Sequence, residues 1–246
     1  MDKILYYSLT AFAVLFTLAA HEFAHAYTAY RLGDGTARSL GRLTLNPLKH
    51  LDPVGAICML LFHVGWAKPV PINARNFKNP KRDFALTAVA GPILNILLAF
   101  IFAFLYLLTL SLANRYATGL EGFARVLLEN FILLLFIFHS VNIGLGIFNL
   151  IPIPPFDGSR LLNVIFPPRI YFGIMRHERK IYWGVLAWLL LGDRVKYMLL
   201  SIPAISSSPI LSTIVGVFSL SDMLGVVIET ISGWMFDLWQ LIPFLA

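Results

Sequence analysis

A short run of residues near position 20 has the types and the spacing of a metal site. His21, Glu22 and His25 form the pattern H-E-x-x-H. Residues four apart on a helix share one face, so both imidazoles can bind one zinc ion while the carboxylate lies beside it. Short patterns also arise by chance, but this one follows seventeen uncharged residues, 4–20. The sequence therefore predicts zinc chemistry at the end of a membrane-spanning helix.

The third zinc ligand is predicted to be Asp157. A catalytic zinc ion usually has three protein ligands and one open position for water, so two histidines do not complete the site. Asp157 ends a 27-residue uncharged stretch, 130–156, and a carboxylate at that depth is costly in lipid unless it is paired or bound to a metal. Three prolines interrupt helical hydrogen bonding just before it, and the glycine after it permits close approach. We expect one zinc ion per chain, held by His21, His25 and Asp157.

These residues also have simpler interpretations. Asp157 could cap a helix just outside the membrane, and the two histidines could be hydrogen-bonded core residues. Glu22 between the histidines argues for a metal site. The remaining histidines fit packing or loop roles: His50, His63, His139 and His177.

The composition is that of an integral membrane protein. Of 246 residues, 58% are hydrophobic and 13% are charged, whereas a soluble domain is nearer half apolar and a quarter charged. The single cysteine, Cys58, excludes an internal disulfide and a cysteine zinc cluster. The net charge of +6 comes from basic residues in loops between apolar stretches, so we do not expect nucleic-acid binding.

The apolar stretches predict an α-helical polytopic membrane protein. Three spanning helices should form a catalytic core, at about 4–30, 84–113 and 130–156. Additional C-terminal helices are expected at 181–191, 209–220 and 223–246, with a break at the charged residues 193–196. We divide the single domain into a membrane-embedded core, residues 1–180, and C-terminal transmembrane or interfacial helices, residues 181–246.

The segment between the first two spans suggests β-structure. Residues 38–45 partly alternate, and residues 68–73 look extended, with prolines that suit an edge strand. Residues 54–64 are apolar but too short to span. We therefore expect a small membrane-associated β-sheet with a re-entrant loop.

The basic residues orient the core. Fourteen of the nineteen Lys and Arg residues lie between the first two predicted spans or at 160–180 after the third, and three lie on the opposite side. Because Lys and Arg are enriched in cytoplasmic loops, the H-E-x-x-H end should face the cytoplasm.

Three motifs in order resemble the site-2 protease family of intramembrane zinc metalloproteases. They are His21-Glu22-x-x-His25, Gly91-Pro92-x-x-Asn95 and N-L-I-P-I-P-P-F-D-G-S-R at 149–160. The segment 65–77 is similar to that of compact bacterial members, and the resemblance covers roughly residues 10–180. Phe156 stands where the family usually has leucine, and the PDZ or CBS modules of larger members are missing.

The resemblance implies regulated intramembrane proteolysis, with transmembrane proteins as substrates, in a bacterial or archaeal cell membrane. Zinc would lower the pKa of a bound water, and Glu22 would take its proton and pass it to the leaving amine. The resemblance also suggests that Asn95 hydrogen-bonds the substrate backbone or the oxyanion, with a helix-bridging role as the alternative. Asn149 and Asn142 are further candidates for lining the cavity.

Two other functions are compatible with the motif. A zinc transporter also carries histidines and carboxylates in the membrane, but a general base within H-E-x-x-H serves no evident purpose in transport. A catalytically idle membrane scaffold is the second alternative.

Overall fold

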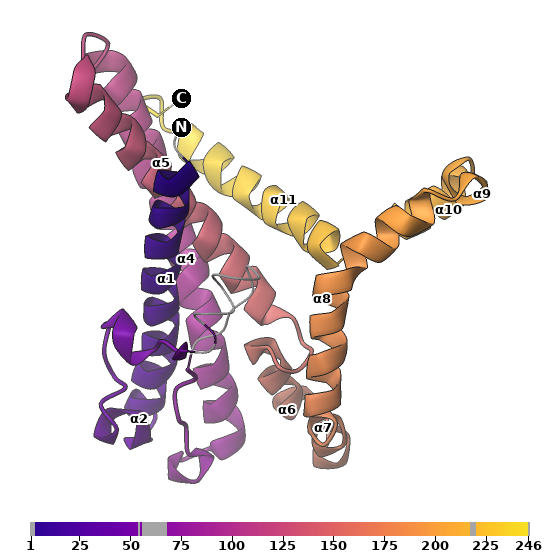
Figure 1. The fold of residues 1–246 in the computed structure, drawn as a ribbon. Helices are drawn as coiled ribbons and strands as arrows, with labels where there is room; N and C mark the ends of the chain where they lie inside the picture. Colours follow the sequence, from indigo (N-terminus) through magenta and orange to yellow (C-terminus); the bar gives the residue numbers. More distant parts are fainter. Residues whose placement is uncertain (1–2, 54, 56–67, 217–219, 246) are drawn as a thin grey trace.

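Three long helices form the core of the protein. The computed structural model describes residues 3–53, 55, 68–216 and 220–245. Within that part, the helices long and apolar enough to cross a membrane are α1 (Lys3–Arg31), α4 (Pro80–Tyr116) and α5 (Gly122–Leu150). They pack side by side, with α4 against both of the others (Figure 1). The protein is therefore an α-helical, multi-pass membrane protein, as the sequence predicts.

Small residues allow these helices to approach closely. Ala13, Ala99 and Ala103 of these helices are fully buried. A Cβ on Gly146 would lie 2.9 Å from the side chain of Ile96, so this face of α5 fits α4 only with glycine there. Helices in a membrane gain little from leaving lipid, so such close contact is a main source of their association.

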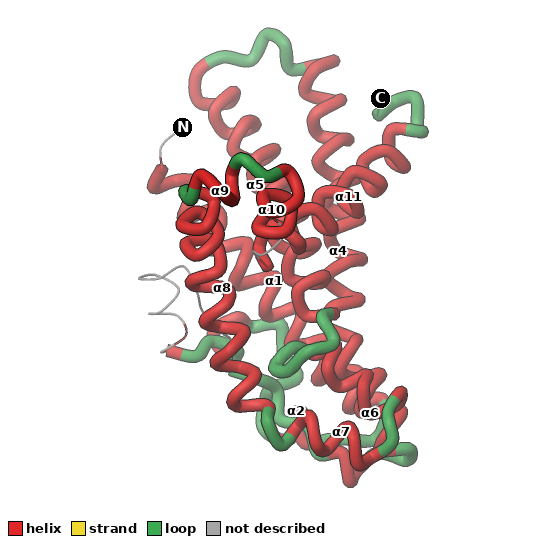
Figure 2. Tube along the Cα trace, turned by 90° about the vertical axis from the view of Figure 1, so that its right-hand side faces the viewer, coloured by secondary structure: helices red, strands yellow, loops and turns green. Residues whose placement is uncertain are grey.

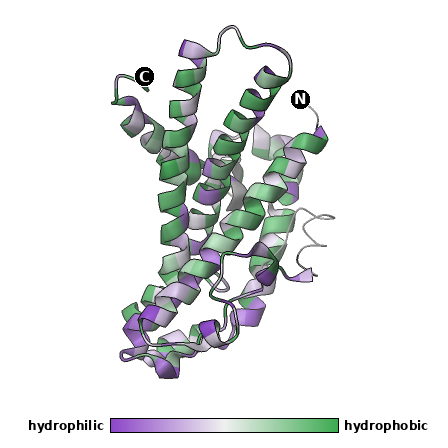
Figure 3. Ribbon diagram, turned by 90° about the vertical axis from the view of Figure 1, so that its left-hand side faces the viewer, coloured by the Kyte–Doolittle hydropathy of each residue, from purple (hydrophilic) through white to green (hydrophobic). Residues whose placement is uncertain are grey.

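Polar residues gather at one end of this core. Figure 3 shows apolar residues along most of the three helices and hydrophilic residues at the end where α2 (Thr36–Ser39) lies. The short helices η1 (Pro47–Lys49) and η2 (Ala74–Asn76) belong to the same connection between α1 and α4. Residues 68–73 precede η2 without helix or strand, and we call them the proline segment.

The expected β-sheet is absent from the described residues, which contain no strand (Figure 2). The first residues of the candidate strand 38–45 belong to α2 instead. The two prolines of the proline segment cannot donate the hydrogen bonds of a sheet. The segment is held instead by the Glu22 and Arg42 side chains and by the His50 backbone. The re-entrant loop predicted at 54–64 falls almost wholly outside the described residues.

The helix α5 ends before the end of the predicted apolar span, 130–156. It stops at Leu150, because Pro152 disfavours helical geometry at the residue before it and cannot donate a helical hydrogen bond. The chain then turns back as η3 (Asp157–Leu161). A Cβ on Gly158 would lie 2.2 Å from the carbonyl oxygen of Leu150, so this return against the end of α5 requires glycine.

The C-terminal third forms an arm that leaves the core and returns to it. It contains α6 (Leu162–Ile165), α7 (Pro168–Met175), α8 (Glu178–Leu200), α9 (Pro203–Ser206), α10 (Pro209–Gly216) and α11 (Leu220–Gln240). The predicted break at 193–196 is wrong, since α8 runs through these residues. Figure 1 shows α8 to α10 projecting from the core.

The last helix attaches the arm to the core through polar contacts. The Trp239 indole donates a hydrogen bond of 3.0 Å to the Phe100 carbonyl of α4. On α5, His139 Nε2 lies 2.6 Å from Ser232 Oγ of α11. The helix α11 is therefore fixed against α4 and α5, even though α8 to α10 extend away.

Candidate metal centre

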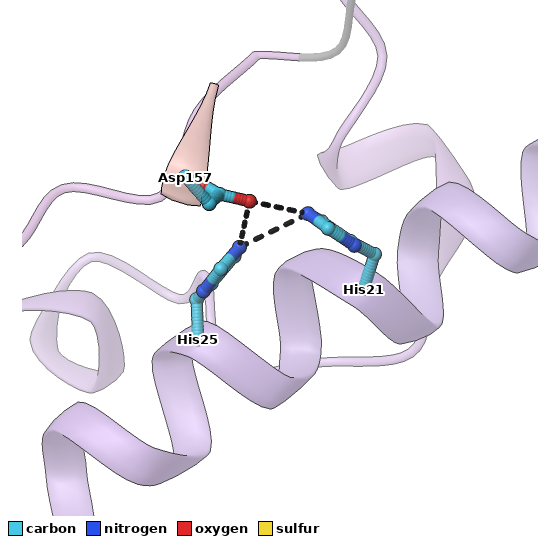
Figure 4. Close-up of side chains that lie close together, drawn as sticks. All are labelled: His21, His25 and Asp157. Atoms are coloured by element: carbon cyan, nitrogen blue, oxygen red, sulfur yellow. Dashed lines mark hydrogen bonds and ion pairs between the residues drawn. The ribbon is translucent and has the colours of Figure 1, made fainter. Parts of the chain in front are cut away.

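Three side-chain atoms from two distant parts of the chain form a compact triangle (Figure 4). Asp157 Oδ2 lies 3.0 Å from His21 Nε2 and 3.2 Å from His25 Nε2, and the two Nε2 atoms are 3.0 Å apart. Tetrahedral zinc with bonds of about 2.0–2.2 Å needs ligand atoms about 3.3 Å apart. The residues therefore fit a zinc ion with only a small outward adjustment.

Each histidine presents the same nitrogen to this triangle. His25 Nδ1 lies 2.7 Å from the backbone oxygen of Thr87, and His21 Nδ1 lies 2.5 Å from the amide oxygen of Asn95. Because both oxygens accept hydrogen bonds, each Nδ1 carries the proton and each Nε2 keeps a free electron pair. The partners on α4 thus set both imidazoles in the tautomer that binds metal.

A polar cavity opens beside the triangle. It has a volume of about 260 Å³, and its wall includes Glu22, His25, Asp157 and Arg160 together with apolar residues of α4 and the proline segment. The Glu22 carboxylate therefore faces the same space as two of the three candidate ligands. A cavity of this size holds water and part of a peptide chain.

The comparisons with known proteins agree with this chemistry. Residues 9–191, three quarters of the chain, match peptidase family M50. The chain belongs to this family, the site-2 protease family. It is thus a zinc metalloprotease.

Three relatives of the protease bear the description "Putative zinc metalloprotease". YwhC of Bacillus subtilis is 38% identical over 200 residues, which cover 78% of this chain and 85% of the relative. Rip2 of Mycolicibacterium smegmatis is 28% identical over 70% of this chain and 61% of its own length. MJ0611 of Methanocaldococcus jannaschii is 30% identical over 45% of this chain and 49% of its own. No solved structure matches the chain significantly.

The Asn95 side chain of the protease lies behind His21, on the imidazole edge away from Asp157. Its amide oxygen contacts His21 Nδ1, and its amide nitrogen donates a 2.9 Å hydrogen bond to Asn142. Asn142 in turn donates to Thr17 Oγ1 over 3.0 Å. This buried chain of hydrogen bonds joins all three core helices, which is the helix-bridging arrangement considered for Asn95.

The other two asparagine candidates also have partners away from the cavity. Asn142 belongs to the buried chain behind His21 and is almost fully buried. Asn149 donates a hydrogen bond of 3.1 Å to the Leu145 carbonyl of its own helix. Neither side chain belongs to the cavity wall described above.

The requirement for glycine at position 91 is visible only in the three-dimensional structure. A Cβ at this position would lie 2.6 Å from His25 Nε2 and 2.8 Å from His21 Nε2. Any larger side chain would therefore collide with the atoms that the metal needs. The glycine-proline pair within a predicted span was the only sequence signal of this constraint.

Val70 of the proline segment is a second residue that the sequence did not single out. Its backbone N–H donates a hydrogen bond of 2.9 Å to Glu22 Oε2. Pro69 and Pro71 have no N–H, so Val70 is the donor available at this point of the segment. One carboxylate oxygen of Glu22 is thereby held in place.

Asp34 anchors the proline segment next to the end of α1. It accepts hydrogen bonds from the Asn73 backbone and from the Asn76 side chain, both at 2.7 Å. Burial raises the pKa of Asp34, but hydrogen bonds from Thr36, Asn73 and Asn76 outweigh that effect and hold the pKa below its usual value. At the other end, Arg42 donates a 2.6 Å hydrogen bond to the Lys68 carbonyl.

Proposed function

We propose that the protease hydrolyses peptide bonds within or near transmembrane segments of membrane proteins, with Glu22 as the general base. The observation that supports this most is the position of Glu22. Its carboxylate shares one polar cavity with His25 and Asp157, at the end of a three-helix core that is apolar enough to lie in a membrane. Peptide hydrolysis at that place requires a substrate that is itself in or next to the bilayer.

His21, His25 and Asp157 would hold one zinc ion. When bound, zinc polarises the scissile carbonyl and lowers the pKa of a water molecule towards neutrality. Glu22 takes a proton from the water, and the water oxygen attacks the carbonyl carbon. The carbon–nitrogen bond then breaks, and Glu22 returns the proton to the leaving amine nitrogen. The Val70 N–H fixes the carboxylate in the orientation needed for both transfers.

Asn95 has a positioning role in this proposal. Both of its polar groups are engaged, one by His21 and the other by Asn142, and the side chain is fully buried. It therefore sets the tautomer and the angle of His21. Asn149 stays a candidate for contact with substrate, since it stands at the end of α5 shortly before Asp157.

The proline segment is proposed to receive the substrate. A membrane helix hides its peptide bonds in its own hydrogen bonds, so the cleaved stretch must unwind and extend. Pro69, Val70 and Ile72 line the catalytic cavity, where an extended stretch of substrate can lie along them. Proline in that stretch of substrate would remove backbone hydrogen bonds to the proline segment and should slow cleavage. Equal rates would contradict hydrogen bonding between the two stretches.

We further propose that the catalytic end faces the cytoplasm of a bacterial or archaeal cell. The basic loop residues adjoin that end of the core, in agreement with the enrichment of Lys and Arg in cytoplasmic loops. Residues 1–180 would form the protease core, with 181–246 as its C-terminal helices in one domain.

The test combines bound metal with proteolysis in the purified, full-length protein. The parent should carry about one zinc per chain, and Asp157→Ala should carry much less, because two histidines alone leave the site incomplete. Glu22→Gln should keep its zinc and lose hydrolysis of a single-span membrane polypeptide by about 100-fold or more. Retained hydrolysis in Glu22→Gln would contradict the assignment of the base.

The same preparation tests the two alternative functions. Zinc transport predicts zinc flux into proteoliposomes, and an idle scaffold predicts bound zinc without hydrolysis. The described residues contain His21, His25 and Asp157 as a metal-binding group, and no second such group there marks a transport path. The geometry thus favours the protease.

A further inference from the structure

A second cavity lies next to the catalytic one and differs from it in chemistry. It has a volume of about 300 Å³ and is lined only by apolar residues and glycine. The residues used below are Val14 and Leu18 of α1, Gly144 and Phe148 of α5, and Leu224 and Ile228 of α11. We call this cavity the apolar groove. Its walls come from three helices, two of which also carry or adjoin the metal ligands.

The apolar groove and the catalytic cavity share one helix, α1, and follow one another along it. Val14, Leu18 and Glu22 are spaced four apart, so they form one stripe on α1. The first two line the groove, and Glu22 lines the catalytic cavity. On the other wall, the ring of Phe148 packs against that of Phe156, 4.3 Å between centroids, and Asp157 follows directly. The groove therefore ends about one helical turn before Glu22 on α1, and the Phe148–Phe156 contact brings its other wall to the residue before Asp157.

We propose that the apolar groove binds the transmembrane helix of the substrate by accepting its apolar side chains, and so delivers the adjoining unwound stretch to the zinc. This inference rests on the proposed function and adds the docking site. Val14 lies eight residues from Glu22, which is about 12 Å along a helix. About two helical turns of substrate thus stay folded in the groove before the extended stretch begins.

The shape of the groove suits a helix more than bulk lipid. Helices in a membrane associate through close packing, for which small residues provide room. Gly144 supplies that room, because a Cβ built there would have no heavy atom within 4 Å. Gly146, two residues on, faces α4 and has no space at all. The opening at Gly144 is thus confined to the groove side of α5.

Gly144→Phe provides a sharp test, because its Cβ has no heavy atom within 4 Å and its ring would occupy space in the groove. Gly184→Phe on α8 is the matched control, since its Cβ also has no heavy atom within 4 Å and it lies outside both cavities. Neither position contacts a zinc ligand, so both variants should keep the zinc content of the parent.

The first readout is binding, which does not require hydrolysis. The full-length protein carries Glu22→Gln, Cys58→Ser and Leu18→Cys, so that the new cysteine is the only one. The probe is a span of about 20 leucine and alanine residues with one cysteine, followed by a glycine-serine segment, in proteoliposomes. We expect a disulfide crosslink that depends on the position of the cysteine in the probe. Gly144→Phe should lower its yield at least fivefold, and Gly184→Phe should not change it.

The outcomes separate this inference from the proposed function. No crosslink, or a yield that Gly144→Phe leaves unchanged, would overturn the docking site, as expected if lipid, another part of this chain or a second copy fills the groove. In the Glu22 parent, Gly144→Phe should slow cleavage of the spanning probe at least tenfold, and Gly184→Phe should leave it within twofold. A crosslink in the Glu22→Gln protein together with a Glu22 parent that does not cleave the probe would support the groove and contradict proteolysis alone.

Discussion

The backbone N–H of Val70 lies 2.9 Å from Glu22 Oε2 and donates a hydrogen bond to it. This contact joins the proline segment to α1 across 48 positions of the chain. It gives the segment a role that its sequence does not show, which is to orient the carboxylate beside the metal ligands. The segment can do so because Asp34 and Arg42 fix its two ends.

Removing this hydrogen bond should slow catalysis without removing zinc. Val70→Pro deletes the N–H, so Glu22 is free to rotate, and we expect hydrolysis to fall about 10- to 100-fold because a misplaced general base is inefficient. Val70→Ala keeps the N–H and removes only packing of the buried side chain, so it should retain most of the activity. Rates on the single-span probe and zinc content check the comparison. Equal rates for the proline and alanine variants would contradict the orienting role.

Adding one methyl group to α4 should expel the metal. In Gly91→Ala the new Cβ would lie within 2.8 Å of both Nε2 atoms, so the imidazoles must move away from the zinc position. We expect zinc affinity to fall by at least about tenfold, as for other changes next to metal ligands. Gly144→Ala adds the same group where no heavy atom lies within 4 Å and should bind zinc normally. Titration against a zinc chelator measures both, and full affinity in Gly91→Ala would refute the close approach.

Asn95→Ala should distinguish a positioning residue from one that stabilises the transition state. The change leaves His21 Nδ1 and Asn142 Oδ1 without their partner on Asn95, which costs about 1–3 kcal/mol in free energy of unfolding. We expect zinc affinity to fall about 10- to 100-fold. If Asn95 instead contacts the oxyanion, kcat should fall at saturating zinc while zinc affinity stays at the parental value. Chelator titration and kcat at high zinc therefore decide between the two roles.

Acid should weaken the anchor of the proline segment through Asp34. Its pKa is lowered in the folded protein, so its hydrogen bonds contribute stability at pH values above the unfolded pKa of about 3.9. That contribution is lost as the pH falls through the lower, folded pKa. Asp34→Asn should therefore reduce the thermal stability of the zinc-free protein at neutral pH, and the difference from the parent should shrink below pH about 4. If the difference in thermal stability between the parent and Asp34→Asn does not change with pH, the charge on Asp34 does not contribute to stability.

The sequence alone determined the helices and singled out the three residues that the structure brings together as a candidate metal site. Long uncharged runs must form helices in a membrane, because every backbone polar group needs an internal partner there. The helices α1 and α4 accordingly cover the predicted spans. His21 and His25 share a helical face by their spacing, and Asp157 was recognisable as a carboxylate that lipid does not tolerate alone.

The prolines that end α5 at Leu150 are also a local signal in the sequence. The tertiary structure decided the shape of the connection between α1 and α4 and the course of the arm. The residues expected to pair as strands make turns and single contacts instead. The charged residues 193–196 lie within α8. Propensity is a weak signal at such positions, because partners far away in the chain determine which local conformation is the more stable.

The roles of Gly91, Asn95 and Val70 also came from the tertiary structure. Each depends on a contact with α1 across 48 to 74 positions of the chain, and residue type alone says nothing about which partner lies opposite. Gly91 is required by two imidazole nitrogens, and Asn95 is fixed by one of the same rings. The sequence thus determined which residues can bind zinc, because spacing on a helix is local. The packing of α4 and the proline segment against α1 determined how those residues are held, because that depends on distances between separate elements.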